Sequence, residues 1–432
     1  QSQVEDMADI STFFKPILWF ITCIGVVIFI CEYLVYYVVM FQCSWPDISV
    51  EKNYKHDGQI SDSAWLFSGK PLGSSARGPA IVNRETRSSK HEQEQNVEDL
   101  RAIFIADTHL LGSRLGHWFD KLRREWQMER GFQASLTLFS PEAVFVLGDL
   151  TDEGQWASDM EFEATAKRFR KMFRHSPDVY FKVVVGNHDV GFHDFMSKRK
   201  LERFSDAFNS SGVEVVTLKN NSFVLVNSMA FHGDGCSFCS SAQTKLRGVS
   251  ERLNCSRFGH QGGDKQKEKG KSRCSHYRSL PAAPPILLQH FPLYRPTDEM
   301  CSGIDGTPLD EKYIPHGQRR EVLSQKATDK LLSWIRPRLV LSAHTHHGCY
   351  IVHQNITPEI SVPSFSWRNR KNPSLILASI SPTSIAINKC FLPEEYLILI
   401  LYAASGVTMA TYILYYLVCI LCRHRWRHVK EL

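Results

Sequence analysis

The sequence lacks a large excess of charge of either sign. Its 432 residues include 51 lysines and arginines and 45 aspartates and glutamates, which leaves a formal net charge of +6. The basic residues form no extended stripe, so nucleic acid is not expected as a partner. Internal repeats and low-complexity composition are also missing, and 43% of the residues are hydrophobic. The chain is therefore long and apolar enough for one large core or two modest ones.

Two stretches near the chain ends are almost free of charge. Residues 396–422 contain no charged residue, and residues 17–40 contain only Glu32. About 20 apolar residues cross a bilayer core, so we expect one transmembrane helix at each end. The first stretch is too long for a cleaved signal peptide. For Glu32 we favour an interfacial position over a functional carboxylate inside the membrane.

The flanks of these stretches predict how the chain crosses the membrane. The tail at 423–432 is rich in arginine and lysine, which places it in the cytosol. Two spans then return the N-terminal flank, residues 1–16, to the cytosol and place the segment between the spans in a lumen. Within that segment, residues 41–98 are polar and predict a stalk or linker, whereas residues 99–390 predict a folded domain with a flexible insertion at 259–280.

Cysteines and glycosylation triplets agree with a lumenal domain. Eight of the twelve cysteines lie between the spans, an even number that predicts a disulfide framework without specifying the pairs. Cys236 and Cys239 have a spacing that also suits zinc, but no second pair accompanies them, so a disulfide is favoured. Asn-X-Ser/Thr triplets, which predict a glycoprotein, begin at Asn209, Asn220, Asn254 and Asn355.

Five apolar runs between the spans each end in aspartate, asparagine or histidine. They occupy residues 102–109, 143–152, 182–189, 285–292 and 339–347. Their β-branched and apolar composition predicts buried strands, and the charged stretches between the first three have helical spacing, as in an α/β domain. Sites in open α/β sheets form at the C-terminal ends of the strands, so the five ends are expected to meet.

The residues at these strand ends are typical of a metal site. Asp107 and His109 are two positions apart, as are His344 and His346, and in extended backbone such pairs point the same way and can chelate one ion or bridge two. Carboxylates, an amide and imidazoles without thiolates suit manganese, iron or zinc. Taken alone, each residue has a simpler interpretation, such as a helix cap at Asp149. Five strand ends together favour two metal ions that share a carboxylate.

The order of these residues resembles the calcineurin-like metallophosphoesterase superfamily. The matching motifs are Asp107-x-His109, Gly148-Asp149-x-x-Asp152, Gly186-Asn187-His188-Asp189, His290 and His344-x-His346. The resemblance implies an α/β fold, a four-layer α/β/β/α sandwich with mixed sheets, here with one transmembrane helix at each end. In one departure, Ala343 replaces a glycine of the last motif. We expect this alanine to be tolerated with slight strain, because it disfavours a positive φ.

The resemblance implies two divalent metal ions, with manganese preferred and iron or zinc as alternatives. Asp107, His109 and His346 would hold one ion. Asn187, His290 and His344 would hold the other, and Asp149 would bridge the two. Two such ions activate water and neutralise a phosphoryl transition state, so no nucleophilic side chain is required.

Further residues are assigned around the ligands. The resemblance implies that His188 is the general acid, which protonates the leaving oxygen, and that Asp152 and Asp189 orient their neighbours. Arg368 and Arg370 suit either a phosphate or glycan contact or a salt-bridged loop, and both interpretations stay open.

A few remaining histidines and tryptophans receive simpler interpretations. His193, His347 and His353 are expected near the site but outside the ligand set, which is already complete. Trp118 and Trp126 are predicted to pack on the face of a helix.

Within the superfamily, residues 107–112, 115–130 and 361–374, set between the two predicted spans, resemble the doubly anchored phosphodiesterases that remodel GPI anchors. This implies removal of ethanolamine phosphate from a mannose of the glycan on GPI-anchored proteins, which promotes their export from the endoplasmic reticulum. The implied location is the early secretory pathway: endoplasmic reticulum exit sites, the intermediate compartment and the cis-Golgi, with cargo receptors as further partners. The alternatives are another phosphate ester, such as a nucleotide, phospholipid or phosphomonoester, and a non-catalytic membrane adaptor. The adaptor would be favoured if a residue of another type stood at His188 or at any position of the metal-ligand set. All of these positions carry the expected residue.

Overall fold

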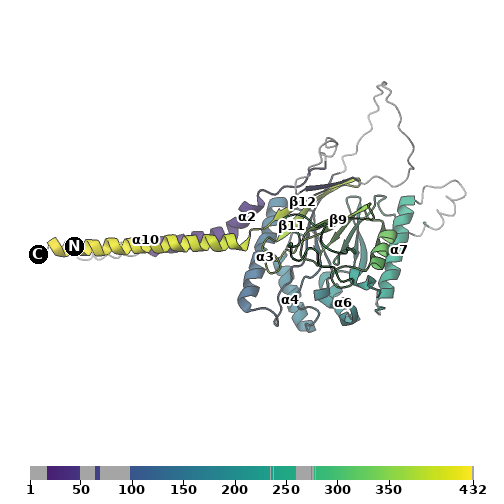
Figure 1. Ribbon diagram of the computed structural model, residues 1–432, viewed down its shortest axis with the longest axis horizontal. Helices are drawn as coiled ribbons and strands as arrows, with labels where there is room; N and C mark the ends of the chain where they lie inside the picture. Colours follow the sequence, from purple (N-terminus) through teal and green to yellow (C-terminus); the bar gives the residue numbers. More distant parts are fainter. Residues whose placement is uncertain are drawn as a thin grey trace, which may run out of the picture.

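A folded domain lies at one end of a long helical stem (Figure 1). The computed structural model describes residues 17–48, 64–68 and 98–430, except positions 234, 237, 259–273, 275, 276 and 278. The predicted N-terminal flank, most of the predicted stalk and most of the predicted insertion lie outside the described residues. The stem consists of an apolar helix near the N-terminus and of α10 (Glu395–Lys430).

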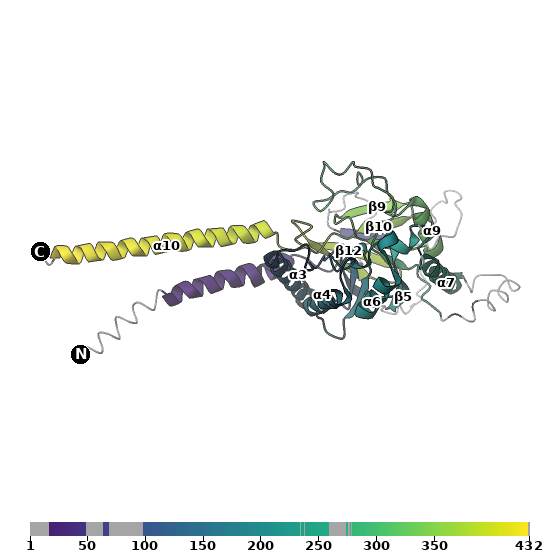
Figure 2. The ribbon, with the colours of Figure 1, turned by 90° about the horizontal axis from the view of Figure 1, so that it is seen from below.

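Both helices of the stem are long and apolar enough to cross a membrane. The first covers Ile17–Met40 and ends with the π-helical turn η1 (Ile30–Leu34) and helix α2 (Val35–Met40). The second is apolar over Glu395–Arg423. Most of their side chains are exposed, as expected for segments that face lipid. Figure 2 shows the two helices leaving the same side of the domain.

Two six-stranded sheets form the centre of the domain. The first has the order β1 (Ala64–Ser68), β12 (Ser384–Phe391), β11 (Ser374–Ile380), β2 (Leu100–Ile105), β3 (Ala143–Leu147) and β4 (Tyr180–Val184). The second has the order β5 (Val213–Leu218), β6 (Asn221–Val226), β7 (Ile286–Gln289), β8 (Leu339–Ser342), β10 (Thr357–Ser361) and β9 (Cys349–His353). Both are mixed: β2, β3 and β4 run parallel in one, and β6, β7, β8 and β10 in the other.

Helices cover the outer face of each sheet. The first sheet is covered by α3 (Trp118–Phe139) and α4 (Asp159–Met172), beside which lie α5 (Asn187–Val190) and α6 (Lys198–Phe208). The second sheet is covered by α7 (Cys239–Phe258) and α9 (Gln325–Ile335). Two 3₁₀ turns complete the elements, η3 (His193–Phe195) and η4 (Ser228–Phe231). This arrangement confirms the predicted four-layer α/β/β/α sandwich.

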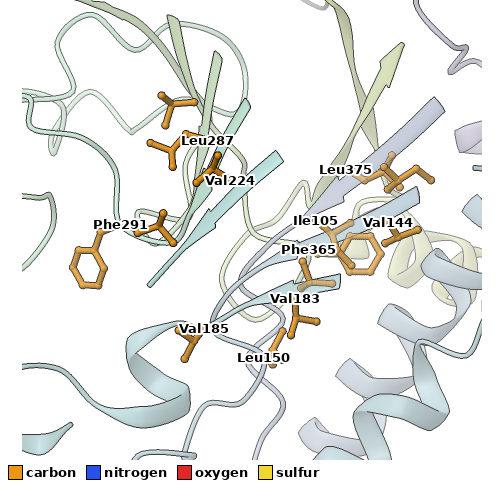
Figure 3. Packing of buried hydrophobic residues seen from close by; sticks show 14 of the residues in the cluster. Ile105, Val144, Leu150, Val183, Val185, Val224, Leu287, Phe291, Phe365 and Leu375 are labelled. Atoms are coloured by element: carbon orange, nitrogen blue, oxygen red, sulfur yellow. The ribbon is translucent and has the colours of Figure 1, made fainter. Parts of the chain in front are cut away.

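The apolar run at residues 102–105 of strand β2 contributes side chains to two cores. Phe104 belongs to the cluster between the sheets, whereas Ile103 and Ile105 belong to the cluster under the helices. Successive side chains of a strand point to opposite faces, so a strand covered on both sides needs apolar residues at every position. Phe145 of the first sheet stacks on Phe223 of the second with ring centroids 4.9 Å apart. Figure 3 shows residues of the cluster under the helices, with Ile105 and Val144 on the first sheet and Val224 and Leu287 on the second.

Four disulfides confirm the predicted framework and the disulfide interpretation of the Cys-X-X-Cys motif. The pairs are Cys43–Cys390, Cys236–Cys239, Cys255–Cys274 and Cys301–Cys349. The free cysteines all lie in the stem, and they are Cys23, Cys31, Cys419 and Cys422. The first pair joins the segment after the N-terminal stem helix to β12, close to the start of α10.

The four asparagines of the glycosylation triplets differ in exposure. Asn209, Asn220 and Asn355 are exposed at the ends of helices or strands, where a glycan has space. Asn254 is half-buried on α7, next to the disulfide-bonded Cys255. Glycosylation of these residues stays a prediction.

Glu32 connects the stem to the domain, a role that neither sequence interpretation included. Its carboxylate accepts hydrogen bonds from Arg123 Nη1 of α3 at 2.8 and 2.6 Å and from the Tyr402 hydroxyl of α10 at 2.8 Å. Nearby, Arg124 Nη1 donates to Glu395 at 2.8 Å. Ion pairs thus fix both stem helices on α3.

Candidate metal centre

The predicted metal ligands come together at the C-terminal ends of strands from both sheets. Asp107, Asp149 and Asn187 follow β2, β3 and β4 of the first sheet. His290 and His344 follow β7 and β8 of the second. Because these strands run parallel within each sheet, their C-terminal ends share one edge of the sandwich.

Among the groups of three side chains that could hold a cation, two consist of predicted metal ligands alone, and the ligand atoms of each lie within 4.8 Å of one another. The first group is Asp107, His109 and His346, and the second is Asp149, His290 and His344. Asp149 Oδ2 lies 3.5 Å from His109 Nε2 and 3.2 Å from His290 Nε2, so this carboxylate lies between the two groups. Asn187 joins the second group, because its Oδ1 lies 3.1 Å from His290 Nε2.

Backbone carbonyls determine which nitrogen of two histidines faces the centre. His290 Nδ1 donates to the carbonyl oxygen of Leu147 at 2.7 Å. His344 Nε2 donates to the carbonyl oxygen of Arg320 at 2.8 Å. A carbonyl oxygen only accepts, so these nitrogens carry the protons, and His290 Nε2 and His344 Nδ1 are the ligand atoms.

His109 and His346 point nitrogens at each other. His109 Nδ1 donates to Asp152 Oδ1 at 3.0 Å, which leaves a lone pair on Nε2 of the neutral ring. This Nε2 lies 3.1 Å from Nε2 of His346. Burial holds the pKa of His346 well below its usual range, so at neutral pH the imidazole of His346 is uncharged. A metal cation fits this position.

Three buried ligand atoms have no hydrogen-bond partner within the described part of the chain. They are Asp107 Oδ1, Asp149 Oδ2 and His344 Nδ1. A buried acceptor without a donor is costly, more so when it is charged. All three atoms belong to the two groups above. The residues present therefore fit two divalent cations.

The charges of the centre support the same conclusion. Burial raises the pKa of Asp107 well above its usual range, and the neighbouring Asp149 adds to the rise. Burial alone would raise the pKa of Asp149 too, but the charge of the adjacent His290 lowers it well below its usual range. Burial lowers the pKa of His290, but Asp149 outweighs burial and raises it to about 9. The buried carboxylates thus compete for positive charge, which divalent cations would supply.

His188 lies at the rim of the centre, with 31% of its side chain exposed. Its Nδ1 donates to the carbonyl oxygen of Asp152 at 2.9 Å, and its backbone N–H donates to Asp149 Oδ1 at 2.8 Å. Nε2 is therefore the nitrogen available to a substrate. The next residue, Asp189, accepts a hydrogen bond from the backbone N–H of Thr151 at 2.9 Å and so joins the loops after β3 and β4.

Residues 100–348 match the family model described as calcineurin-like phosphoesterase, which is more than half of the chain. The chain belongs to the calcineurin-like phosphoesterase family. It is similar to Metallophosphoesterase 1 of Gallus gallus, with 45% identity over 388 residues that cover 90% of this chain and 87% of that protein. For Metallophosphoesterase 1 of Danio rerio the identity is 43%, covering 88% of this chain and 86% of that protein.

This phosphoesterase is therefore a metal-dependent, membrane-associated phosphoester hydrolase. The family match favours this interpretation over the alternative of a non-catalytic membrane adaptor. Its fold implies a centre of two metal ions. Among solved structures, a dimetal phosphatase from Danio rerio is similar over 68% of this chain and 99% of that chain, at 10% identity and a TM-score of 0.38. That likeness is too distant to bear on the ligands of this phosphoesterase.

The backbone of the phosphoesterase centre is not extended, which corrects one step of the sequence interpretation. The predicted ligands with a left-handed backbone are Asp107 (φ 51°), His109 (44°), Asp149 (49°), His344 (70°) and His346 (62°). Such conformations are uncommon outside glycine and cluster at functional sites. His344 and His346 enter different groups, whereas Asp107 and His109 enter the same one.

Ala343 does not carry the strain expected for it. The residue is fully buried, belongs to the cluster between the sheets and is not among the described residues with a positive φ. Its N–H donates to the carbonyl oxygen of His290 at 2.8 Å. The left-handed turn begins at His344 instead, so the methyl group of alanine has room in this phosphoesterase.

Two glycines leave space for the ligands. At Gly148, whose φ is +91°, a Cβ atom would lie 2.5 Å from His290 Nδ1. At Gly186, a Cβ atom would lie 2.2 Å from Asp149 Oδ1. Any larger residue at either position would displace a ligand of the phosphoesterase centre.

Arg368 and Arg370 border the centre from the loop before β11, and both have internal partners. Arg368 Nη1 donates to Asp152 Oδ2 at 2.7 Å, while 31% of the arginine side chain stays exposed. Arg370 donates to Nδ1 of His347 and, at 3.1 Å, to Oδ1 of Asn372. Arg368 thus forms a salt bridge and also presents an accessible edge.

Sequence reasoning missed the groups that orient the ligands through backbone atoms. The carbonyl oxygens of Leu147 and Arg320 fix His290 and His344, but a carbonyl is common to all residues, so the sequence holds no signal for this role. Ser364 was missed as well. Its hydroxyl donates to the carbonyl oxygen of Asp107 at 2.7 Å.

The remaining histidines near the motifs have partners outside the two groups. His353 Nε2 lies 2.7 Å from Glu359 Oε2, and His193 Nε2 donates to the carbonyl oxygen of Arg319 at 3.0 Å. His347 is bonded to Arg370. Within the described part of the chain, none of the three belongs to a metal-binding group.

Proposed function

We propose that this membrane-associated phosphoesterase removes ethanolamine phosphate from a mannose of the GPI glycan on GPI-anchored proteins. The residues that resemble GPI-remodelling enzymes support this substrate, and so does the similarity to Metallophosphoesterase 1 of several vertebrates. A lipid-borne substrate also requires a catalytic centre near the membrane.

One loop links the candidate metal centre directly to the stem, and this is the structural observation that supports the proposal most. Trp367 Nε1 donates to the carbonyl oxygen of Pro393 at 2.8 Å, just before α10 begins. The same indole ring packs edge-on against Tyr36 of the first stem helix, with ring centroids 6.1 Å apart. The next residue, Arg368, binds Asp152 of the centre. A substrate held in the same membrane therefore has a high effective concentration at the centre.

In this proposal each of the two groups would hold one ion, and the Asp149 carboxylate lies between the groups. The first ion would be held by Asp107, His109 and His346, and the second by Asn187, His290 and His344. Manganese is the proposed metal, because carboxylate, amide and imidazole ligands without thiolate suit it. When bound, the ions supply activated water and positive charge around the phosphate.

The side chains around the centre supply the remaining chemistry. Water adds to phosphorus through its oxygen and releases one proton to solvent, from which His188 is later reprotonated, and the bond from phosphorus to the mannose oxygen breaks. His188 gives the proton on its Nε2 to that oxygen, while its Nδ1 stays bonded to the Asp152 carbonyl. Arg368 offers N–H donors to a phosphate oxygen, while Asp152 holds the guanidinium in place. The products are phosphoethanolamine and a free mannose hydroxyl.

We place this reaction in the lumen of the early secretory pathway, between endoplasmic reticulum exit sites and the cis-Golgi. Four disulfides, three exposed glycosylation triplets and the basic residues at the C-terminal end of α10 support this orientation. Cargo receptors that recognise trimmed GPI anchors are the proposed downstream partners.

The test is mass spectrometry of GPI glycans from cells that lack this protein. We expect ethanolamine phosphate to persist on the mannose, to disappear after rescue with the wild type and to persist with Asp149→Ala or His188→Ala. His175→Ala, which changes an exposed histidine, is the matched control and should rescue. Normal glycans in the deficient cells, or full rescue by His188→Ala, would show that the substrate is another phosphate ester or that the mechanism is wrong.

A further inference from the structure

The first turn of α3 and the loop before it expose four large apolar side chains. Leu115, Trp118, Phe119 and Leu122 are 54%, 69%, 57% and 60% exposed, and we refer to them as the α3 patch. The sequence prediction that Trp118 packs on a helix face is therefore wrong within the described chain. Four neighbouring apolar side chains of this size on a surface commonly mark a contact with a partner or a membrane.

The α3 patch lies on the helix face opposite the core. Phe119, Arg123, Trp126 and Arg130 recur at intervals of three or four residues, which places them along one side of α3, with Leu122 beside them. The other side packs into the domain, and its buried residues are Gln127, Met128, Gly131, Phe132, Ala134, Ser135 and Phe139. The patch is therefore the N-terminal part of a continuous outer face.

The C-terminal part of that same face contacts the stem. Trp126 packs edge-on against Tyr33 of the first stem helix, with ring centroids 5.4 Å apart. Arg130 lies over the Tyr33 ring at 5.1 Å, and Arg123 forms the ion pair with Glu32. The C-terminal part of this side of α3 therefore contacts the first stem helix, and its N-terminal part carries the exposed α3 patch.

The contact with the stem lies where the stem helices leave the domain. Beyond Glu32, Tyr36 and Met40 of the first helix are fully buried in the domain. On the other side of Glu32, toward the N-terminus, the apolar side chains are mostly exposed. Both views show α3 on the side of the domain from which α10 leaves (Figures 1 and 2). The outer face of α3 therefore lies at the level of the membrane surface.

We propose that the α3 patch inserts into the interfacial layer of the bilayer as a third membrane contact beside the two stem helices. Continuity with a membrane helix identifies lipid as the occupant. Tryptophan suits this layer because its ring is apolar and its N–H reaches water or headgroups. The inference does not depend on which phosphate ester is cleaved.

A third contact has a geometric consequence for the metal centre. Two adjacent helices leave the domain free to tilt on the membrane, whereas a contact to one side of them restricts that tilt. The loop that carries Leu115 begins directly after His109, a predicted metal ligand. The patch therefore holds the centre at a defined height above the lipid surface.

Tryptophan quenching by brominated lipid tests the proposal directly. The full-length protein is placed in nanodiscs of phosphatidylcholine, with or without bromine on the acyl chains. The signal of Trp118 is the difference in emission between the wild type and Trp118→Phe. It is expected to fall by at least about half in the brominated discs, because interfacial indoles contact the upper part of the acyl chains.

Trp334 provides the matched control. It lies on α9, which packs against α7 at the end of the domain away from the stem (Figure 2), and its signal, isolated with Trp334→Phe, should be equal in both discs. Equal hydrolysis of a soluble phosphodiester by Trp118→Phe and the wild type verifies the fold. A Trp118 signal that bromine leaves unchanged would overturn the proposal and indicate that solvent, a second copy or another protein covers the patch.

Discussion

Hydrogen bonds to individual ring atoms orient the histidine ligands of the metal centre. The ring nitrogens of His109, His290 and His344 that do not face the centre are bonded to an aspartate or a carbonyl oxygen. Their other nitrogens, with Asp107 Oδ1 and Asp149 Oδ2, are left for cations. Each ligand is thus oriented before a metal ion binds, which limits the reorganisation that binding requires.

His188 should matter only when the leaving oxygen needs a proton. We expect His188→Ala to lower kcat/KM for an alkyl phosphodiester by roughly 10²- to 10⁴-fold, the usual contribution of a general acid. For bis(p-nitrophenyl) phosphate the loss should be much smaller, because nitrophenolate leaves without protonation. Steady-state kinetics on the two substrates checks this. Equal losses on both would assign His188 to substrate binding or structure.

Gly148 should be essential for the geometry of His290. In Gly148→Ala, the new Cβ would lie 2.5 Å from His290 Nδ1, at a φ of +91° that alanine rarely adopts. We expect a loss of about 1–3 kcal/mol in stability and reduced metal content. Gly212→Ala is the control, because its Cβ would meet only Asn227 Cβ at 3.7 Å. Thermal unfolding and metal analysis compare the two, and similar values for both variants would contradict this account.

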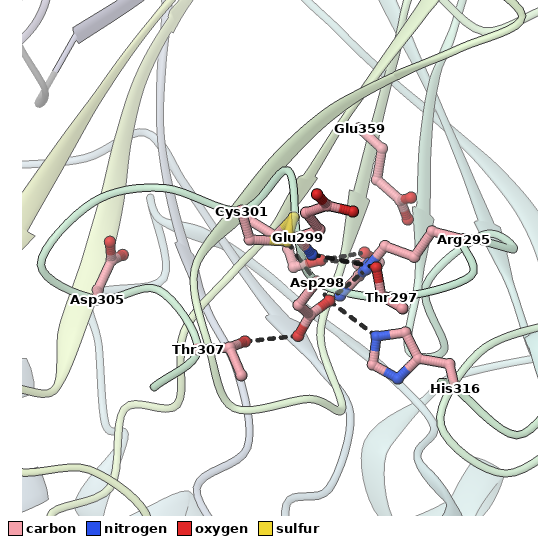
Figure 4. Close-up of a disulfide and its surroundings, with 12 residues drawn as sticks. Arg295, Thr297, Asp298, Glu299, Cys301, Asp305, Thr307, His316 and Glu359 are labelled. Atoms are coloured by element: carbon pink, nitrogen blue, oxygen red, sulfur yellow. Dashed lines mark hydrogen bonds and ion pairs between the residues drawn. A yellow bond between two sulfur atoms is a disulfide. The ribbon is translucent and has the colours of Figure 1, made fainter. Parts of the chain in front are cut away.

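At the level of elements, the long connection between β7 and α9 supports the centre from outside. Asp298 organises it by accepting hydrogen bonds from Arg295 Nε at 2.7 Å, Thr307 Oγ1 at 2.5 Å and His316 Nε2 at 2.8 Å (Figure 4). The same connection carries Arg320, whose carbonyl oxygen fixes the ring of His344. The residue whose carbonyl orients His344 thus lies on the same connection as the buried network of Asp298.

Asp298→Asn should destabilise the protein in a pH-dependent way. Burial alone would raise the pKa of Asp298, but the hydrogen bond of His316 and the charge of Arg295 lower it below its ordinary value of 3.8. The stabilisation is thus fully present above that value and is lost as the pH falls below it. We expect a loss of about 3–5 kcal/mol at pH 7, typical of a broken buried ion pair, and a smaller difference from the wild type below pH about 4.

Unfolding curves between acidic and neutral pH measure this effect. Asp329→Asn serves as the control, because its exposed carboxylate bonds only to amide side chains and should contribute little. A difference between Asp298→Asn and the wild type that stays constant as the pH is lowered would refute the assigned role.

At the scale of the whole molecule, the sequence predicted those features that require a particular type of side chain, namely the buried strands and the metal ligands. The apolar runs that end at Asp149 and His290 predicted buried strands and a shared cluster, because burial and metal ligation each require particular side chains. The left-handed backbone at the ligands and the carbonyl of Arg320 depend on tertiary packing, which the local sequence does not encode. The exposure of Trp118 was missed for a related reason. A helix pattern shows which residues share a face, but not whether that face meets protein or lipid.

One disulfide links the two ends of the fold. Cys43–Cys390 connects residues 347 positions apart, next to both stem helices, whereas Cys236–Cys239 connects residues only 3 positions apart. In the chain-entropy model a loop of this length contributes roughly 5–6 kcal/mol. Replacing Cys43 and Cys390 by serine should therefore lower Tm far more than the same change at Cys236 and Cys239. Equal shifts would show that strain or other contacts dominate.

Metal stoichiometry tests the central claim, a hydrolase with two metal ions on one shared carboxylate. The full-length protein is purified, stripped with a chelator and titrated with manganese, while bound metal and phosphodiester hydrolysis are followed together. We expect activity to be lost on stripping and to reach its maximum at two ions per chain, and Asp149→Ala to bind fewer ions and stay inactive. Full activity of the stripped protein, or saturation of activity at a single ion, would contradict the account.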